Sequence, residues 1–186
     1  MFKNYFKKLF FIPFLLLWAE NVAAEYVITD ERPLIQAIEK KDIEKTRQIL
    51  SRGSNPNVRA HNKNTALIVA IQNEDVEISE LLLEADARVK DRDSIGNDAL
   101  IWATRKNNYE LVDLLIAWDA PVDTQAPDGM TPLMLAAYEG YFDLVELLIN
   151  AGADIKKTDR TGKNVLSWAK LGGNQAIITM IENSLP

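Results

Sequence analysis

Apolar residues along this chain return at a fixed interval of 33 positions, with polar residues and glycines between them. The interval is kept by a leucine column and an alanine column: Leu34, Leu67, Leu100, Leu133 and Leu166, and Ala37, Ala70, Ala103, Ala136 and Ala169. Two columns that stay identical through five units predict a structural repeat in place of a single globular core. In each unit, two short apolar stretches with helical spacing predict a pair of helices joined by a turn.

The unit that begins at Thr131 has the clearest helix signals. Thr131 and Pro132 predict a helix start, because a hydroxyl can cap free backbone N–H groups and proline is tolerated in the first turn. This helix is expected to end at about Tyr138, with Gly140 in the turn that follows. A second helix is expected from near Asp143, whose carboxylate suits the positive end of a helix.

Glycines and their replacements predict how the helices and hairpins end. Gly152 supplies the left-handed residue that ends the second helix of this unit. Asp86 and Asp119 replace that glycine in two other units, and we expect them to be left-handed at a modest cost in stability. Lys63 replaces a hairpin glycine, which predicts a less regular hairpin tip. The pair Gly172-Gly173 predicts a turn between the last two helices.

The sequence Thr-Pro-Leu-Met-Leu-Ala-Ala at 131–137, followed by Gly140 and by Ala-Gly-Ala-Asp at 151–154, resembles the ankyrin repeat with its TPLH-x-A opening and 33-residue period. The resemblance covers about residues 30–186. It implies an all-α ankyrin-repeat solenoid of about five helix-turn-helix repeats with hairpin loops. The expected repeats, named one to five below, are approximately residues 30–58, 59–91, 92–124, 125–157 and 158–186.

Polar residues replace apolar ones in the two end repeats. Lys45 and Gln48 stand where the interior repeats have aliphatic residues, and Lys170 and Glu182 stand where others have small or aliphatic residues. A terminal repeat has one face without a neighbour, so these residues predict caps on both ends of a five-repeat array. Capped ends argue against end-to-end polymerisation, and we expect a monomer.

The segment 1–24 has the composition of a secretory signal peptide. Three lysines are followed by an apolar run at 9–19 and by the small residues Val22, Ala23 and Ala24. The run is shorter than the roughly 20 residues that span a membrane, so a core helix or an uncleaved anchor are the weaker alternatives. Cleavage after Ala24 would leave residues 25–186 as the repeat domain, exported to a periplasm or secreted. It would change the net charge from −6 to −8, because the removed segment holds three lysines and one glutamate.

Composition gives little support for catalysis. With 27 acidic and 21 basic residues, the chain is a poor candidate for non-specific binding to nucleic acid. It has no cysteine, which excludes disulfides, thiolate metal sites and cysteine nucleophiles, and its one histidine, His61, is expected in an exposed hairpin loop. The Asp-x-x-Gly strings at 93–96 and 159–162 are expected to build turns. We therefore predict no catalytic, metal or cofactor site and no enzymatic activity.

Aromatic residues occupy several informative positions in the repeat. Trp102 and Trp168 fall beside the alanine column on the first helices of repeats three and five. Their position fits either packing in the core or contact with a ligand, and the sequence leaves both open. Tyr109 and Phe142 match Ile43 and Val76, so we expect them in the core.

The resemblance implies that a partner protein is bound by the hairpin tips and by the concave face that the first helices form. The matching tip positions in this chain are His61, Asn62, Asn64, Ser94, Ile95, Asn97, Asp128, Met130, Arg160 and Lys163. The matching helix positions are Glu39, Lys40, Gln72, Asn73, Arg105, Lys106, Tyr138 and Glu139.

Within this surface, Ile95, Met130 and Tyr138 are expected to form a small exposed apolar centre flanked by Arg105 and Lys106. Isolated surface apolar residues are the equally weighted alternative. Exposed aromatic residues are typical of binding hot spots, so the expected exposure of Tyr138 and of Trp118, near the end of a second helix, is notable. The candidate partner-binding residues are Ile95, Asn97, Arg105, Lys106, Met130, Tyr138, Glu139 and Trp118.

These observations predict an exported, non-catalytic module that binds another protein. The alternative is an accessory or inhibitor protein of an exported enzyme. The bacterial periplasmic ankyrin proteins that the sequence resembles include members tied to toxin immunity and to peroxide defence.

Overall fold

The computed structural model describes residues 32–184, which form ten helices in five consecutive pairs. The first helices of the pairs are α2 (Arg32–Glu39), α4 (Ala66–Gln72), α6 (Ala99–Arg105), α8 (Pro132–Glu139) and α10 (Val165–Gly172). The second helices are α3 (Ile43–Ser51), α5 (Val76–Glu84), α7 (Tyr109–Ala117), α9 (Phe142–Asn150) and α11 (Gln175–Ser184). In this part of the chain the only β pairing consists of two isolated bridges, at Arg59–Thr65 and Thr158–Asn164.

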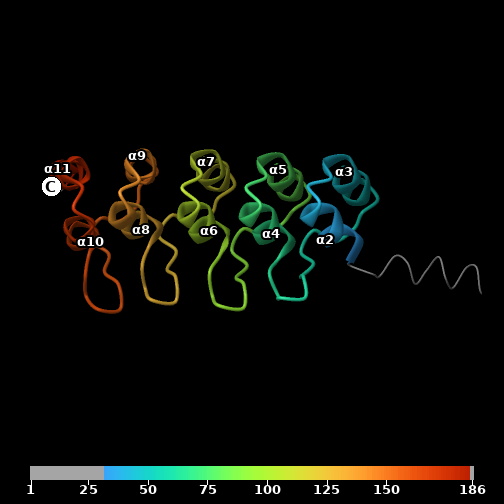
Figure 1. Cartoon of the computed structure of the whole chain (residues 1–186), viewed down its shortest axis with the longest axis horizontal. Coiled ribbons are helices and arrows are strands. Elements are labelled where there is room, and N and C mark those ends of the chain that lie inside the picture. Colours follow the sequence, from blue (N-terminus) through green and yellow to red (C-terminus); the bar gives the residue numbers. More distant parts are fainter. Residues whose placement is uncertain (1–31, 185–186) are drawn as a thin grey trace, which may run out of the picture.

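The pairs stack side by side into an elongated solenoid (Figure 1). The first helices form one layer and the second helices form another, and a hairpin loop extends from the first-helix layer between successive pairs. We call the side formed by the first helices and the hairpins the first-helix face, which the resemblance identifies as concave. The layer of second helices is called the outer layer. The expectation of an all-α repeat solenoid is confirmed.

Polar side chains cap the first helices in four successive repeats. The capping residues, each accepting a hydrogen bond from the backbone N–H three positions later, are Thr65, Asp98, Thr131 and Asn164. Such a cap satisfies one of the N–H groups that a helix start leaves free. Helix α8 begins at Pro132 and ends at Glu139, with Gly140 left-handed at φ +83°, close to the predicted bounds.

The second helices also start on short polar residues in most repeats. Asp75 and Asn108 accept from the backbone of α5 and α7, whereas Tyr141 precedes α9 without a side-chain cap. Helix α9 starts at Phe142, one residue before the predicted Asp143. The left-handed helix ends are confirmed, with φ values of +85° at Gly152, +67° at Asp86 and +59° at Asp119.

The hairpin tip at Lys63 is as regular as the others, so that prediction is wrong. Lys63 adopts φ +67°, and its N–H donates to the Ala60 carbonyl at 2.8 Å while the Ala60 N–H donates to the Asn64 carbonyl at 2.9 Å. An equivalent bond from Gly96 to Asp93 closes the next hairpin at 3.2 Å. These bonds hold the lysine in a conformation that glycine would adopt at lower cost.

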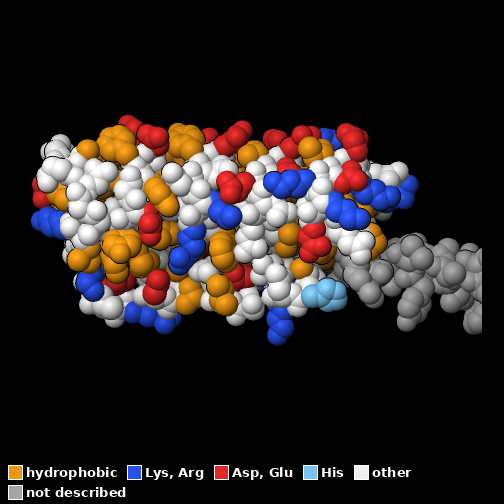
Figure 2. All heavy atoms as spheres, viewed as in Figure 1, with side chains coloured by type: hydrophobic (Ala, Val, Ile, Leu, Met, Phe, Trp, Pro, Cys, Tyr) orange, Lys and Arg blue, Asp and Glu red, His pale blue; other side chains and the backbone are white. Residues whose placement is uncertain are grey.

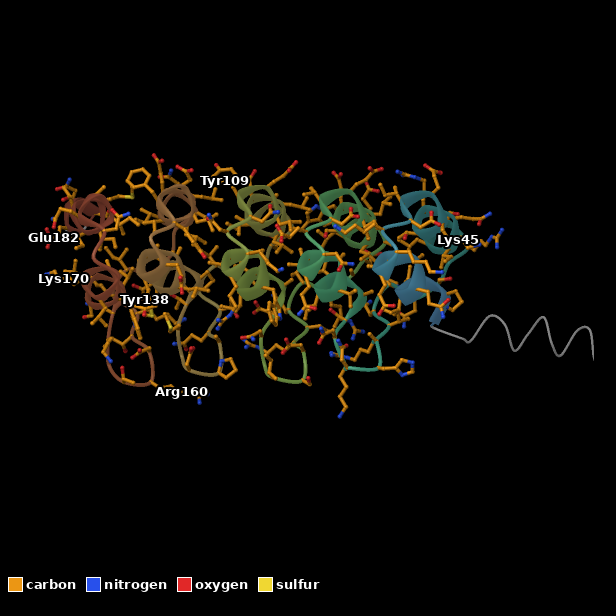
Figure 3. All side chains as sticks on the ribbon, in the orientation of Figure 1. Lys45, Tyr109, Tyr138, Arg160, Lys170 and Glu182 are labelled. Carbon is orange, nitrogen blue, oxygen red and sulfur yellow. The ribbon has the colours of Figure 1, made fainter. Side chains whose placement is uncertain are left out.

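The core is spread along the solenoid in thin layers. The alanine column is buried in every repeat, which lets neighbouring first helices approach closely. The leucine column is buried from Leu34 to Leu133, whereas Leu166 is half-buried because no repeat follows it in the described chain. At that end Lys170 Nζ lies 3.6 Å from Glu182 Oε1, so the predicted polar cap takes the form of an exposed ion pair (Figure 3).

Gly172 does not lie in a turn, contrary to the expectation for the Gly172-Gly173 pair. It is the last residue of α10, and only Gly173, at φ +78°, stands beyond the helix. A Cβ atom on Gly172 would overlap the backbone carbonyl of Tyr138. The absence of a side chain at 172 therefore allows α10 to pack closely on α8.

A ladder of long side chains links successive hairpins. Arg59 Nη1 donates to the Arg92 carbonyl at 2.8 Å, Arg92 Nη1 to the Gln125 carbonyl at 2.8 Å, and Gln125 Nε2 to the Thr158 carbonyl at 3.1 Å. Each of these side chains also donates to the carbonyl four residues later in its own hairpin. The ladder fixes the hairpins relative to one another and holds the tip residues in a defined row.

No helix of the described residues is long and apolar enough to cross a membrane. The predicted signal peptide at 1–24 lies outside the described residues.

Candidate functional site

Asp93 connects a hairpin tip to the first helix of the same repeat. Its Oδ1 accepts from the backbone N–H groups of Ile95 and Asn97, both at 2.9 Å, which confirms that the Asp-x-x-Gly string builds a turn. Its Oδ2 accepts from Trp102 Nε1 at 2.7 Å. The carboxylate therefore fixes both the turn and the indole ring.

Asp159 repeats this arrangement in the last hairpin. Trp168 Nε1 donates to Asp159 Oδ2 at 3.1 Å, and the backbone N–H groups of Thr161 and Lys163 donate to Oδ1. Burial alone would raise the pKa of the Asp159 carboxyl, but these bonds and one from the Thr161 hydroxyl lower the pKa below its ordinary value. The folded hairpin therefore stabilises the charged form of the Asp159 side chain.

The sequence left open whether the two tryptophans pack in the core or contact a ligand, and the structure shows features of both. Trp102 and Trp168 are half-buried, with one part of each ring packed on the core and the indole N–H bound within its own repeat. A ring held in this way is part of the scaffold and still presents surface to solvent. Trp168 also has an aromatic neighbour on the preceding first helix.

That neighbour is Tyr138, whose ring meets Trp168 edge to face with 5.4 Å between the ring centroids. Leu171 lies one helical turn after Trp168 on α10 and is 60% exposed. We call Tyr138, Trp168 and Leu171 the aromatic patch. It lies on the first-helix face over α8 and α10, where Figure 2 shows a cluster of apolar side chains and Figure 3 labels Tyr138.

Cationic side chains surround the aromatic patch. Lys163 Nζ lies 5.3 Å from the Trp168 ring centroid, and Lys170 is exposed on the same helix as Trp168. Arg105, the last residue of α6, and Lys106, which follows it, are exposed one first helix away. Lys106 forms an ion pair of 3.5 Å with Glu74, whereas Arg105 forms no ion pair with any residue that the structure describes.

The predicted apolar centre of Ile95, Met130 and Tyr138 is wrong. Ile95 is exposed at its tip as expected, but Met130 is only 9% exposed because it packs into the core between its hairpin and helix. Asn97, expected at an accessible tip, is only 3% exposed. Both residues occupy the position where the hairpin strand returns toward the first helix, so their side chains point into the repeat.

Trp118 is exposed as predicted, but it lies away from Arg105 and Tyr138. It follows α7 in the outer layer and lines a shallow groove of about 370 Å³ with Leu83 and residues 86–91 of the preceding repeat. Glu139 is exposed beside Tyr138 at the end of α8. Arg105, Lys106, Tyr138 and Glu139 thus lie at the ends of the neighbouring helices α6 and α8. Ile95 lies at a hairpin tip, and Trp118 lies in the outer layer.

Tyr109 and Phe142 are exposed, which contradicts their expected place in the core. Each is the first residue of a second helix, where Ile43 and Val76 are also only half-buried. The position lies at the edge of the core, so a large aromatic ring there extends onto the outer layer. Tyr109 there lines a polar groove of about 450 Å³ (Figure 3).

Sequence reasoning did not identify Leu171 as a candidate residue. The signal was present, because Leu171 follows Tyr138 by one repeat interval and so occupies the same register on the next first helix. The polar residues of the last repeat, such as Lys170, predicted a cap there and not an apolar surface.

Among residues 32–184, no group of three or more His, Cys, Asp or Glu side chains is arranged to hold a metal ion. His61 is exposed in its hairpin loop, as predicted. By contrast, aromatic and cationic side chains of the first-helix face contact one another, as Tyr138 and Lys163 do with Trp168.

A family model of ankyrin repeats matches the sequence over residues 34–126 and again over 118–184. This chain belongs to the ankyrin repeat family. Ankyrin repeats are generally protein–protein interaction modules, and the fold is typically non-catalytic. A search of curated proteins finds none that matches this ankyrin repeat protein.

Proposed function

We propose that this chain is an exported, non-catalytic module that binds another protein through its hairpin tips and its concave first-helix face. The observation that carries the proposal is the aromatic patch, in which Tyr138 and Leu171 expose large apolar surface on a rigid array of interaction repeats. Aromatic side chains at the centre of a contact surface contribute a large share of binding energy in protein interfaces.

The scaffold holds this surface in one arrangement before binding. Trp168 is fixed by its hydrogen bond to Asp159, and the hairpins are joined by the ladder that starts at Arg59. A surface that is already ordered loses less conformational entropy when a partner binds. Such preorganisation supports a binding role that needs no large rearrangement of the repeats.

Export is supported by the sequence of the segment 1–24, and a periplasm is the compartment that we propose. A chain without cysteine tolerates an oxidising compartment, because it has no thiol to oxidise. The polar caps support a monomer. Two narrower roles fit a small exported binding module: an inhibitor that neutralises a toxin, or an accessory protein of a peroxide-defence enzyme.

Photo-crosslinking in the cells that make the protein tests the binding role. A photoreactive phenylalanine at Tyr138 is compared with the same residue at Tyr109, which is similarly exposed (42% and 50%) but lies in the outer layer. We expect a discrete protein adduct from position 138 and none from position 109. Adducts from position 109 alone, or no adduct from position 138, would contradict the proposal.

A further inference from the structure

Acidic side chains of this protein are concentrated in the outer layer. From α5 onward, every charged residue within a second helix is acidic: Glu77, Glu80, Glu84, Glu110, Asp113, Asp143, Glu146 and Glu182. Figure 2 shows acidic groups along the edge that the second helices occupy. A negatively charged partner is therefore repelled by this layer.

Around the aromatic patch on the first-helix face, positively charged side chains outnumber negatively charged ones. Arg105 and Lys163 flank the patch without an acidic partner among the described residues, whereas Lys106 and Lys170 are paired with Glu74 and Glu182. Glu139 is the one acidic side chain within α4, α6, α8 and α10. The hairpin of repeat four adds Asp128 near this surface. A strongly acidic chain that keeps cations on one face presents a field that attracts a negatively charged segment to that face.

Arg105 stands in line with the patch. It occupies the same register on α6 as Tyr138 on α8 and Leu171 on α10, each one repeat interval after the last. The three side chains therefore form a row across neighbouring first helices, with the guanidinium at one end and the apolar groups beyond it.

Arg105 also leaves a hydrogen bond of the repeat unmade. In repeat two, Asn64 Nδ2 donates to Gln72 Oε1 at 2.9 Å and so joins the hairpin to α4. The equivalent residues in repeat three are Asn97 and Arg105, and arginine has no acceptor, so Asn97 Nδ2 cannot make this bond. Within the described chain the Arg105 side chain also makes no ion pair, so its guanidinium is available for a contact outside the scaffold.

We propose, on the basis of the proposed function, that the partner presents an extended acidic segment to this row. A carboxylate of the segment pairs with the Arg105 guanidinium, and a large apolar side chain packs on the aromatic patch. Neighbouring helix axes are about 8–10 Å apart and an extended chain advances about 3.3 Å per residue, so the two anchors are about three residues apart. The ligand class is an acidic peptide with one aromatic or large aliphatic anchor.

A displayed library of random peptides, selected against the purified protein, tests this inference. We expect enrichment of sequences in which Asp or Glu stands about three positions from Trp, Phe or Leu. Arg105→Gln is expected to weaken the selected peptides roughly tenfold, whereas Arg52→Gln, which removes an exposed arginine beyond α3, leaves affinity unchanged. The Arg105→Gln protein should not unfold at lower urea concentration, because its new amide can pair with Asn97 as Gln72 pairs with Asn64.

The outcomes separate this inference from the proposed function. Peptides that lose binding with Tyr138→Ala but not with Tyr109→Ala, and that show no preference for carboxylates, would overturn the inference and leave the binding surface in place. Equal loss of affinity with Arg105→Gln and Arg52→Gln would overturn it too, as would a library without binders that depend on Tyr138. The proposed function is tested separately, because it fails if the crosslinking at position 138 yields no adduct.

Discussion

The indole nitrogen of Trp102 donates a hydrogen bond of 2.7 Å to Asp93 Oδ2, and so ties a hairpin tip to the helix behind it. Trp168 and Asp159 form the same pair in repeat five. Repeats two and four have neither partner, because the equivalent residues are Ala60 with Val69 and Ala126 with Leu135. In repeats two to five, the aspartate and the tryptophan therefore occur together or are absent together.

The pairing predicts a coupled loss of stability in repeat three. Asp93→Ala and Trp102→Val each break the bond, so the double variant, which copies repeat two, should cost less than the sum of the single variants. We expect a coupling free energy of about 1–2 kcal/mol from urea unfolding of the four proteins. Additive losses would show that the bond contributes nothing to stability.

Lys63 is a site where stability can be gained. It holds φ +67° in a hairpin whose other versions use glycine, so Lys63→Gly should raise the free energy of unfolding by about 0.5–1 kcal/mol. Lys90→Gly is the matched control, because Lys90 is an exposed lysine without positive φ. Lys90→Gly should leave the free energy of unfolding unchanged or lower it. If both substitutions raised it, backbone strain at Lys63 would be contradicted.

Gly172 is where α10 and α8 come closest. Gly172→Ala places a methyl group against the Tyr138 carbonyl, and we expect a loss of about 1–3 kcal/mol in the free energy of unfolding. Glu139→Ala alters the same register one repeat earlier and should change stability little. If Gly172→Ala unfolded at the same urea concentration as the wild type, the close approach of Gly172 to the Tyr138 carbonyl would be contradicted.

Asp159 predicts a pH-dependent contribution to stability. Its pKa in the folded protein is lowered, because hydrogen bonds from Lys163, Thr161 and Trp168 outweigh the opposing effect of burial. A group of this kind stabilises the fold above its unfolded pKa of about 3.9, and the contribution is lost as pH falls through the lower folded value. The stability difference between wild type and Asp159→Asn should therefore be largest near neutral pH and shrink in acid. A difference that stays constant from neutral pH into acid contradicts this assignment.

The repeat period and the helix ends could be predicted from the sequence because they depend on local chemistry. Thr131 caps a helix and Gly152 ends one wherever they stand in such a unit. Asp86 and Asp119 take the left-handed conformation for the same local reason. Bonds closed within a few residues require no knowledge of the neighbouring repeats.

The composition of the surface could not be predicted in the same way. Met130 was expected outside and is buried, while Tyr109 and Phe142 were expected inside and are exposed. These outcomes depend on how far a side chain reaches across the gap between repeats, which the spacing of residues does not specify. The aromatic patch likewise depends on contact between Tyr138 and Trp168, two residues on different helices.

The most direct test of the central claim is the affinity of the cross-linked partner for two variants of this protein. Tyr138→Ala removes an exposed ring from the first-helix face, and Tyr109→Ala removes one from the outer layer. We expect the dissociation constant, measured by calorimetry, to rise about tenfold or more for Tyr138→Ala and to stay within about twofold for Tyr109→Ala. Equal effects, or a larger effect at Tyr109, would contradict binding through the first-helix face.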